Sequence, residues 1–336
     1  MGLGRSFKQQ MSKHSGRRAL GSAAAVAGIG ASIMASGPAA GAAPAGYHSA
    51  GNVAVGQHPE AVAVDQADGT AYVSNQNDFG GTVSVVNEAK KSVATTIQLG
   101  RGTSPDGVAV DPNTRTVFVA DTTNNRVSMI DTASHGVRGS IPVGSNPGGI
   151  AVDSKTGRVY VTTEHGVAVI NEATRAVVAT VPVAHIINSS DDIGVDPNKG
   201  RVYVGTTSGV AEIKESTNAV AATVRVGKAM GGIAVDSATG TVYSSHDGTE
   251  AVIPESANKV TKTITGVAGA YADAADPASK TMFVGGSKGL SVINEATNTV
   301  SGTAAGTPAN SITANPATGT VYAVNSLEGT VTLYQA

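Results

Sequence analysis

The stretches "GVAVDPNTRTVFVAD" (residues 107–121) and "GIAVDSATGTVYSS" (residues 232–245) are two copies of one repeated unit. In each copy an acidic residue is followed, seven positions later, by an aromatic ring, as Asp111 is by Phe118. The complete set of such pairs is Asp65/Tyr72, Asp111/Phe118, Asp153/Tyr160, Asp196/Tyr203, Asp236/Tyr243, Asp276/Phe283 and, with an amide, Asn315/Tyr322. Successive pairs lie 46, 42, 43, 40, 40 and 39 residues apart, and a repeat of about forty residues is typical of a propeller array. The sequence therefore predicts an all-β, seven-bladed β-propeller.

Each unit contains four short segments with the alternation of antiparallel β-strands. The first is a run of small and branched residues such as Val108–Val110, as expected for strands crowded around a central channel. A turn follows, in which the Asp side chain can accept from the backbone N–H two residues on and a Gly or basic residue ends the turn. The second strand carries the aromatic ring, and the third and fourth resemble "GVAVIN" (166–171) and "VVATVPV" (177–183). No stretch after the first forty or so residues has helical periodicity.

The two ends of the repeat array predict how the ring closes. The last unit stops after its third strand, "GTVTLYQA" (329–336), and so lacks a fourth. Just before the first unit, "AGNVAVGQHP" (50–59) matches the fourth-strand pattern. We therefore expect the N-terminal strand to complete the last blade, which would hide both sheet edges. On this division the blades begin near residues 59, 105, 147, 190, 230, 270 and 309 of a domain spanning 43–336.

Residues 1–42 have the composition of a secretory signal peptide. Basic residues at positions 5, 8, 13, 17 and 18 precede the soft apolar run "ALGSAAAVAGIGASIMASG" (19–37), and an Ala-x-Ala site at 40–42 predicts cleavage after Ala42. The Arg17–Arg18 pair is compatible with export by the twin-arginine route as well as by the Sec route. A membrane anchor is disfavoured because the run is short and rich in Gly and Ala. We expect a secreted protein with no membrane span in the mature chain.

The net charge of the chain disfavours one class of function, and its cysteine content excludes disulfides. All five charged residues of the leader are basic, so the remaining chain has 18 Lys and Arg against 25 Asp and Glu, a net charge of −7. This sign disfavours nucleic-acid binding, which depends on neutralising phosphates. The chain has no Cys, which excludes disulfides, and the size of the ring makes them unnecessary. We expect a monomer.

The units resemble the YVTN-type β-propeller repeat of bacterial and archaeal surface and periplasmic proteins. The resemblance rests on "GVAVDPNTRTVFVADTTNNRVSMIDTAS" (107–134) and "GIAVDSKTGRVYVTTEHGVAVINEATRAVVATVPV" (149–183), and it covers residues 50–336. It implies an extracytoplasmic binding scaffold. The catalytic motifs of propeller lyases and lactonases do not align with this chain, so no catalytic residue follows from the resemblance.

The positions at which the chain departs from the repeat are candidates for a ligand-binding site. Loops that lead into each first strand and loops that join the second and third strands open on one face of the disc, where function in propellers is usually located. The candidate ligand-binding residues on or near this face are His58, Glu60, Asp106, Glu164, His165, His185, Asp191, Asp192, His246, Asp247, Tyr271 and Asp273. The loop "VAHIINSSDDIGV" (183–195) is three residues longer than its blade 3 counterpart, and Asp273 occupies a slot held by Val or Ile in the other six blades. A carboxylate in such a slot needs a partner because its burial is costly.

Each candidate also has a structural interpretation. The histidines could be ordinary polar loop residues, Asp191 and Asp192 could cap the longer loop, and Asp273 could be held by a Ser or a backbone N–H of a neighbouring blade or lie in a slightly shifted strand. The functional interpretation is a metal site, for which His165, His185, His246 and Asp273 are the candidates, because imidazoles and carboxylates suit both a divalent metal and acid–base chemistry.

The sequence thus leaves two main functions open, beside a purely structural role at the cell surface. The first is a non-enzymatic module that binds an extracellular ligand or protein through its loop face. The second is an enzyme at the channel mouth, a metal-assisted lyase or lactone hydrolase. Convergence of the histidines and acids would favour the enzyme, and their dispersal around the rim would favour the binding module. Neither the ligand nor a cofactor, beyond a candidate divalent metal, follows from the sequence.

Overall fold

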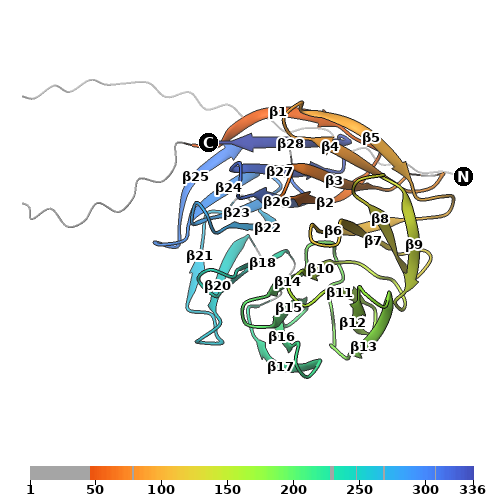
Figure 1. Ribbon diagram of the computed structural model, residues 1–336. Helices are drawn as coiled ribbons and strands as arrows, with labels where there is room; N and C mark the ends of the chain where they lie inside the picture. The colour runs from red at the N-terminus through yellow and green to blue at the C-terminus, as the bar shows by residue number, and fades with distance from the viewer. Residues whose placement is uncertain (1–45, 78, 228–230, 247, 268, 307) are drawn as a thin grey trace, which may run out of the picture. The chain divides into compact units, whose positions relative to one another are not determined.

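The fold is built entirely from antiparallel sheets. The computed structural model describes residues 46–77, 79–227, 231–246, 248–267, 269–306 and 308–336, and within these ranges it contains 28 strands and no helix. The strands form seven four-stranded sheets (Figure 1), each of which is one blade. The predicted all-β, seven-bladed propeller is confirmed.

The strands follow the chain in order through the blades. Blades 1 to 3 contain β2 (Pro59–Asp65), β3 (Thr70–Asn75), β4 (Thr82–Asn87), β5 (Ser92–Gln98); β6 (Pro105–Asp111), β7 (Thr116–Asp121), β8 (Arg126–Asp131), β9 (Val137–Pro142); and β10 (Ile150–Asp153), β11 (Arg158–Thr163), β12 (Gly166–Asn171), β13 (Ala176–Val181). Blades 4 and 5 contain β14 (Ile193–Asp196), β15 (Arg201–Thr206), β16 (Gly209–Lys214), β17 (Ala219–Val224); and β18 (Ile233–Asp236), β19 (Thr241–His246), β20 (Thr249–Pro254), β21 (Lys262–Ile264). Blades 6 and 7 contain β22 (Ala270–Asp276), β23 (Thr281–Gly286), β24 (Gly289–Asn294), β25 (Thr299–Ala305); and β26 (Ser311–Asn315), β27 (Thr320–Asn325), β28 (Thr330–Gln335), with β1 (His48–Ala54).

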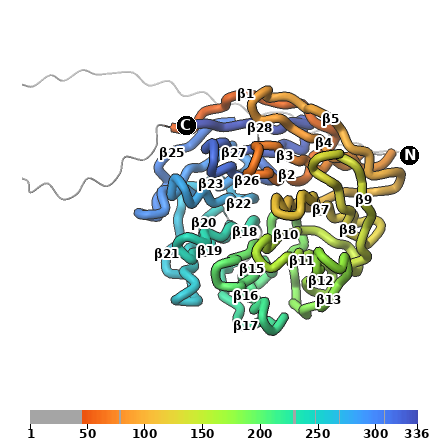
Figure 2. The backbone as a smooth tube through the Cα atoms, viewed as in Figure 1, coloured from red at the N-terminus to blue at the C-terminus, as the bar shows by residue number. Residues whose placement is uncertain are grey.

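The seven blades close into a ring. The innermost strands β2, β6, β10, β14, β18, β22 and β26 contact one another in this order, and β26 contacts β2 again. Figure 2 follows the chain around this ring from one blade to the next. The last blade is completed by β1, which pairs antiparallel with β28 from His48 opposite Gln335 to Ala54 opposite Thr330. The closure expected from the sequence is therefore observed.

The turn between the first and second strands has the same construction in every blade. Its first residue accepts a hydrogen bond from the backbone N–H two positions on, over 2.8–3.1 Å, in the pairs Asp65/Ala67, Asp111/Asn113, Asp153/Lys155, Asp196/Asn198, Asp236/Ala238, Asp276/Ala278 and Asn315/Ala317. The residue four positions after it has a positive φ, as in Gly69, Arg115, Gly157, Gly200, Gly240, Lys280 and Gly319. A short polar acceptor and a left-handed residue together define the turn, which explains the repeated Asp.

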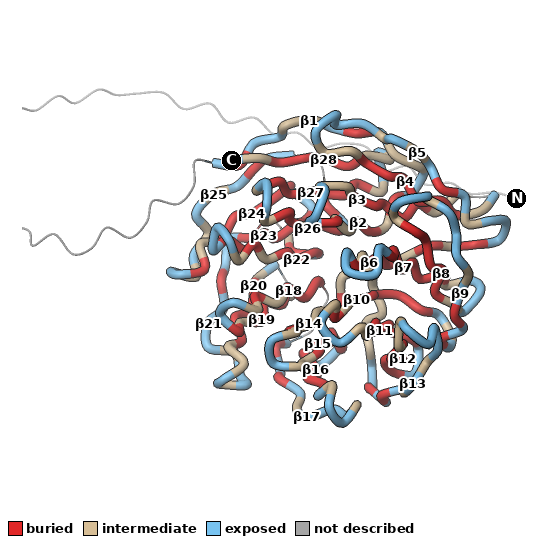
Figure 3. Tube along the Cα trace, viewed as in Figure 1, coloured by how far each residue is buried: buried red, intermediate tan, exposed pale blue. Residues whose placement is uncertain are grey.

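The core lies between the blades. Seven hydrophobic clusters each combine residues of two neighbouring blades, as when Phe118 of blade 2 packs in one cluster with Val159 of blade 3. Figure 3 shows the buried inner strands and the largely exposed outermost ones. All seven repeated aromatic rings are at most 4% exposed. The aromatic residue therefore serves the contact between blades and not only its own sheet.

A carboxyl of a half-buried or buried Glu meets the repeated phenol across several blade interfaces. Tyr322 of blade 7 donates to Glu88 of blade 1 over 2.6 Å, and Thr320 donates to the other oxygen of the same carboxyl. Tyr160, Tyr203 and Tyr243 likewise interact electrostatically with Glu215, Glu255 and Glu295, the residues that open the turn between the third and fourth strands of the next blade. This pairing has no local signature in the sequence, because the two residues are far apart in the chain.

Removal of β1 tests the closure. Deletion of residues 46–54 leaves β28 as an unpaired sheet edge and removes Val53, which is 3% exposed, from the core between blades 7 and 1. We expect the mature chain to melt at a lower temperature and to aggregate. The milder Val53→Ala variant should lower the free energy of unfolding by about 1–3 kcal/mol, whereas Ala substitution of the neighbouring exposed Asn52 should have little effect. Equal melting of residues 43–336 with and without this deletion would contradict the closure.

Candidate functional site

The two ends of the ring differ in the loops they carry. Because the strands of each blade alternate in direction, the loops before the first strand and those between the second and third strands meet on one face, which we call the loop face. The turns that join the first to the second and the third to the fourth strand lie on the other, which we call the turn face. Every candidate residue within the described ranges is in a loop of the loop face or in a strand end next to it, except Asp273, which lies in the middle of β22.

A narrow channel runs between the innermost strands. A cavity of about 250 Å³ within it is lined by residues of all seven blades, most of them Val, Ile or Ala. Two carboxyl groups interrupt this lining, those of Asp191 and Asp273. Both were predicted from departures from the repeat, and the structure places both in the channel.

Asp191 crosses the channel. It lies in the lengthened loop before β14, where its backbone oxygen accepts from the Ile233 N–H of blade 5 over 2.8 Å. Its side chain reaches blade 7, where the Ser311 hydroxyl donates to Oδ1 over 2.9 Å. The other oxygen, Oδ2, is buried and accepts no hydrogen bond from the described residues. Burial raises the pKa of Asp191 well above its ordinary value, and the carboxyls of Asp273 and Asp106 raise it further.

Asp192 holds its own loop together. Its Oδ2 accepts from the backbone N–H groups of Asn188 and Ser189 over 2.6 and 3.2 Å. Burial nevertheless raises the pKa of this fully buried carboxyl to about 8, against the effect of these hydrogen bonds. The capping interpretation therefore describes Asp192 and does not describe its neighbour Asp191.

Asp273 occupies the apolar slot without any shift of its strand. It lies opposite Val284, as Val62 lies opposite Val73 in blade 1. Ser245 of blade 5 binds it twice, through the backbone N–H to Oδ2 over 3.0 Å and through the hydroxyl to Oδ1 over 2.6 Å. The alternative in which a neighbouring blade's Ser and backbone N–H hold this carboxyl is the one observed.

A second buried acid, Glu250, shares the same hydroxyl. Its Oε2 lies 2.8 Å from the Oγ of Ser245, and the residue is fully buried. A hydroxyl has one proton to donate, so two carboxyls that both contact it are satisfied only when one of them is itself protonated. In agreement, burial raises the pKa of Asp273 to about 7 and that of Glu250 well above its ordinary value, to which the Asp273 charge also contributes.

Comparison of the repeats contains a signal for Glu250 that the sequence analysis missed. The residue takes a slot that is apolar in every other blade, where it is filled by Val83, Val127, Val167, Val210, Leu290 and Val331. The comparison that singled out Asp273 in the first strand would have found Glu250 in the third strand.

Two further acids lie at the loop-face end of the first strands of blades 1 and 2. Burial raises the pKa of Glu60, and burial together with the Glu60 charge raises the pKa of Asp106 to about 7. We call the six carboxyls Glu60, Asp106, Asp191, Asp192, Glu250 and Asp273 the acidic mouth. Within the described ranges none of the six pairs with Lys or Arg, because the four ion pairs found there involve other residues. The half-buried members Glu60 and Asp106 can therefore hold protons and accept hydrogen bonds from a ligand, whereas Asp192, Glu250 and Asp273 are buried.

The histidines are spread around the loop face. His58, His165 and His185 are exposed, as is Glu164, whereas the half-buried His246 contacts Thr249 Oγ1 through Nε2 at 3.2 Å. Asp247 lies outside the described residues. Within the described ranges no three His, Asp or Glu side chains are close enough to hold a metal ion. The metal candidates His165, His185, His246 and Asp273 are thus not brought together.

Exposed apolar side chains gather on the same face. Phe79 in the β3–β4 loop is 87% exposed, Leu327 in the β27–β28 loop is 85% exposed, and Tyr271 at the start of β22 is 48% exposed. These residues, which we call the apolar loop residues, belong to blades 1, 7 and 6, which are consecutive in the ring. The other exposed large hydrophobics among the described residues are Val137, Val178 and Val220, all on outermost strands. Only Tyr271 was predicted; Phe79 and Leu327 are single apolar residues in polar loops and were overlooked.

Comparisons with known proteins support the fold and give no information on the function. No family model and no curated protein sequence matches the chain. Among solved structures, a chain of hydrazine synthase from Kuenenia stuttgartiensis is similar, with a TM-score of 0.70 and 16% sequence identity over 83% of this chain and 96% of that chain. At this identity the likeness shows the propeller fold alone. As to membranes, the described residues include no helix long and apolar enough to cross one.

The raised pKa of Asp273 predicts how stability depends on pH. Its value of about 7 in the folded chain, against an ordinary 3.8, means that the folded state keeps a proton that the unfolded state releases. The stabilisation is therefore complete at low pH and is lost as the pH rises through 7. The Asp273→Asn variant has no such proton to lose. Between about pH 5 and pH 8 its free energy of unfolding should therefore fall less than that of wild type, and the difference should be roughly 1 kcal/mol or more.

Chemical denaturation across this pH range measures the difference. Asn substitution of the exposed Asp68 serves as the matched control, because that carboxyl is not buried in the channel. Parallel pH profiles for wild type and Asp273→Asn would show that the proton is not held at this carboxyl.

Proposed function

We propose that this chain is an exported binding module of the YVTN propeller type that docks a protein partner on its loop face. The observation that carries the proposal is the exposure of the apolar loop residues, above all Phe79 and Leu327, on consecutive blades of one face. Complete burial of one such side chain contributes about 1.5–3 kcal/mol, so leaving both in water is unfavourable unless a partner covers them.

The neighbourhood of these residues suits docking on a rigid surface. Within the loop face, the Gln76 N–H donates to the His58 carbonyl over 3.0 Å, and the Ser326 hydroxyl donates to the Pro59 carbonyl over 2.6 Å. The loops that carry Phe79 and Leu327 are thereby tied to the same segment at the start of blade 1. A partner would meet two apolar side chains at a fixed separation, which lowers the entropic cost of binding.

The acidic mouth supplies the polar part of the same face. Its half-buried members Glu60 and Asp106 accept hydrogen bonds and hold protons, and they suit a partner that presents N–H or hydroxyl donors between its apolar contacts. The enzyme interpretation required the histidines and acids to converge on one point. The described residues disperse the histidines around the rim, which favours the binding module.

Export completes the proposal. Residues 1–42 act as a cleaved secretory signal and residues 43–336 form the mature propeller, which meets an extracellular partner as a monomer. The absence of Cys is compatible with this location because the ring is stabilised by the packing between its blades. The net charge of −7 after residue 42 favours a protein partner over a nucleic acid.

Site-specific crosslinking tests the docking face. A photoreactive phenylalanine analogue at position 79 or 327 should crosslink the same partner protein from the surroundings of the producing cells. The analogue at position 178, where the native Val178 is 49% exposed on an outermost strand, is the matched control. Phe79→Ser should strongly reduce crosslinking from position 327, because two anchors on one face contribute to one interface. Identical crosslinked species from positions 79, 327 and 178 would contradict the proposal.

N-terminal sequencing tests export separately. We expect the protein in the culture medium to begin at Ala43, because the Ala-x-Ala site ends at Ala42. Recovery of an intact chain beginning at Met1 from the cytoplasm would contradict the assignment of residues 1–42.

A further inference from the structure

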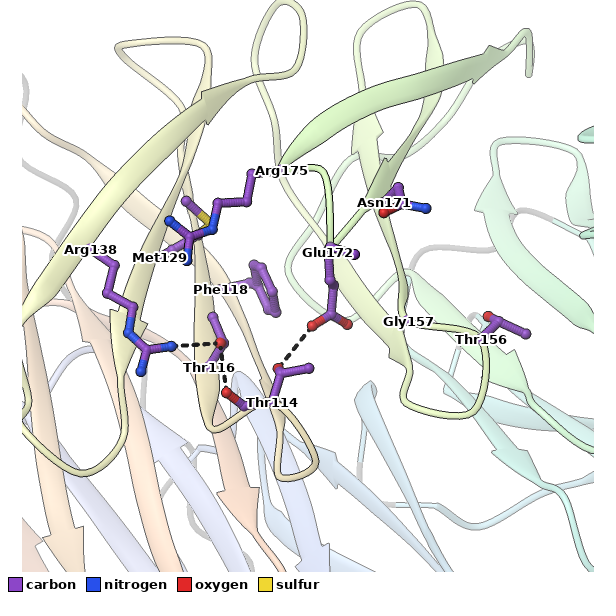
Figure 4. A pocket seen from close by; sticks show the side chains of 11 residues that line it. Thr114, Thr116, Phe118, Met129, Arg138, Thr156, Gly157, Asn171, Glu172 and Arg175 are labelled. Atoms are coloured by element: carbon purple, nitrogen blue, oxygen red, sulfur yellow. Dashed lines mark hydrogen bonds between the residues drawn. The ribbon is translucent and has the colours of Figure 1, made fainter.

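A second candidate site lies on the turn face, between blades 2 and 3. There a cavity of about 300 Å³, at the lower end of the range for small-ligand sites, opens between the two sheets (Figure 4). Phe118 and Met129 of blade 2 contribute its apolar lining, and Arg138, Arg175 and Glu172 contribute its charged groups. None of these residues belongs to the loop face.

The cavity lies where blade 2 departs from the repeat at the aromatic slot. At the interface between blades 7 and 1, the hydroxyl of Tyr322 reaches Glu88 over 2.6 Å. The corresponding pair between blades 2 and 3 is Phe118 and Glu172, and Phe118 has no hydroxyl. Glu172 accepts from the Thr114 hydroxyl over 2.9 Å, while its buried Oε1 has no hydrogen-bond partner among the described residues.

Two further residues of blade 2 shape the space beside this ring. Met129 occupies a slot that holds the shorter Val in four other blades, at Val85, Val169, Val252 and Val292. Opposite it in the next strand is Gly139, which has no side chain to cover it. The flexible thioether can move with whatever fills the space, as methionine does in adaptable binding surfaces.

The protein itself shows what a phenylalanine in this slot accepts. The only other Phe in the repeated position is Phe283 of blade 6. Against it the ring of Tyr47, from the segment before β1, packs edge-to-face with 4.8 Å between ring centroids and 73° between ring planes. An aromatic ring thus occupies the space that a Tyr–Glu pair fills elsewhere. Among the described residues no second aromatic ring packs against Phe118, which is 1% exposed and lines the cavity.

The rim of the cavity is suited to an anion. Arg138 is paired with Asp131 and also contacts the Thr116 hydroxyl at 3.4 Å. Arg175 is exposed, and within the described ranges it has neither a hydrogen-bond nor an ion-pair partner. Figure 4 shows the two guanidinium groups on the same side of the cavity as Phe118 and Met129.

At mildly acidic pH the Glu172 carboxyl does not neutralise the positive charge of the two guanidinium groups. Its burial, together with the nearby Asp111 carboxyl, raises the pKa of Glu172 to about 7. In the protonated form the carboxyl donates a hydrogen bond and does not repel an anion.

From this geometry we propose that the cavity binds a small aromatic carboxylate, with its ring against Phe118 and Met129 and its carboxylate against the guanidinium groups of Arg175 and Arg138. The ring takes the place that Tyr47 fills at Phe283, and guanidinium groups bind carboxylates through strong charge-assisted hydrogen bonds.

Calorimetric titration of the mature chain at about pH 6 tests the ligand class. Benzoate and phenylacetate are the probes, acetate lacks the ring, and benzyl alcohol lacks the charge. We expect one saturable site for the aromatic carboxylates and at least tenfold weaker binding of acetate and benzyl alcohol. The proposal is overturned if neither aromatic carboxylate binds at about 10 mM, or if acetate binds equally well.

Two variants locate the binding to this cavity. Phe118→Tyr restores the residue that five other blades carry and places a hydroxyl toward Glu172, so it should abolish binding without loss of thermal stability. Arg175→Asn should weaken benzoate binding at least tenfold; its turn conformation, with φ of 52°, is the one that Asn adopts at the same position in blades 4, 5 and 6. Because Arg175 is exposed and its replacement suits the turn, this variant should fold even if Phe118→Tyr does not.

The matched control is Lys91→Asn, which removes a cation from the same turn position of blade 1, with φ of 49°. Its affinity for benzoate should equal that of wild type. Unchanged affinity in both Phe118→Tyr and Arg175→Asn, or an equal loss in Lys91→Asn and Arg175→Asn, would overturn the site. Because the cavity is on the turn face, these results do not depend on the docking of a partner on the loop face.

Discussion

Pairing of β1 with β28 is the constraint on which the rest of the molecule depends. Each blade presents one face to the preceding blade and one to the next, and the seven hydrophobic clusters lie in the wedges between them. A wedge is filled only if every blade has two neighbours, so an open ring would expose apolar faces as well as strand edges. The six residue pairs in register between β1 and β28 complete blade 7, and Val53 of β1 joins the cluster between blades 7 and 1.

The closed ring makes possible contacts between blades that are not adjacent. Asp191 belongs to blade 4, yet its partner Ser311 belongs to blade 7, on the far side of the channel. Such a contact joins opposite sides of the ring, in addition to the contacts between neighbours. It also leaves a buried carboxyl oxygen without a hydrogen-bond partner among the described residues, which is the kind of group that functional sites retain.

Variation within a fixed repeat accounts for the chemical features of this protein. The slots taken by Asp273 and Glu250 are apolar in the other blades, and their two carboxyls share the hydroxyl of Ser245. The slot taken by Phe118 holds Tyr in five blades, and here a ring without a hydroxyl lines a cavity beside Glu172. In each case the scaffold stays in register while one side chain changes. The two faces can therefore acquire different binding properties independently.

The sequence by itself determined the architecture. The Asp that opens each turn, the left-handed residue that ends it and the aromatic ring seven positions after the Asp are all local requirements, and local requirements repeat visibly along the chain. Closure by the N-terminal strand also followed, because a missing fourth strand at one end matched a surplus strand at the other. Asp273 and Asp191 were found as departures from the same repeat, and Glu250 could have been found in that way.

Only the tertiary structure decided what these residues contact. Nothing local links Asp191 to Ser311, Tyr47 to Phe283 or Glu88 to Tyr322, since each pair is more than a hundred residues apart. Their meeting depends on the path of a loop across the channel and on the order of blades around the ring. The exposure of Phe79 and Leu327 is of the same kind. Whether an apolar side chain in a loop is covered depends on its neighbours in space, which a repeat period does not specify.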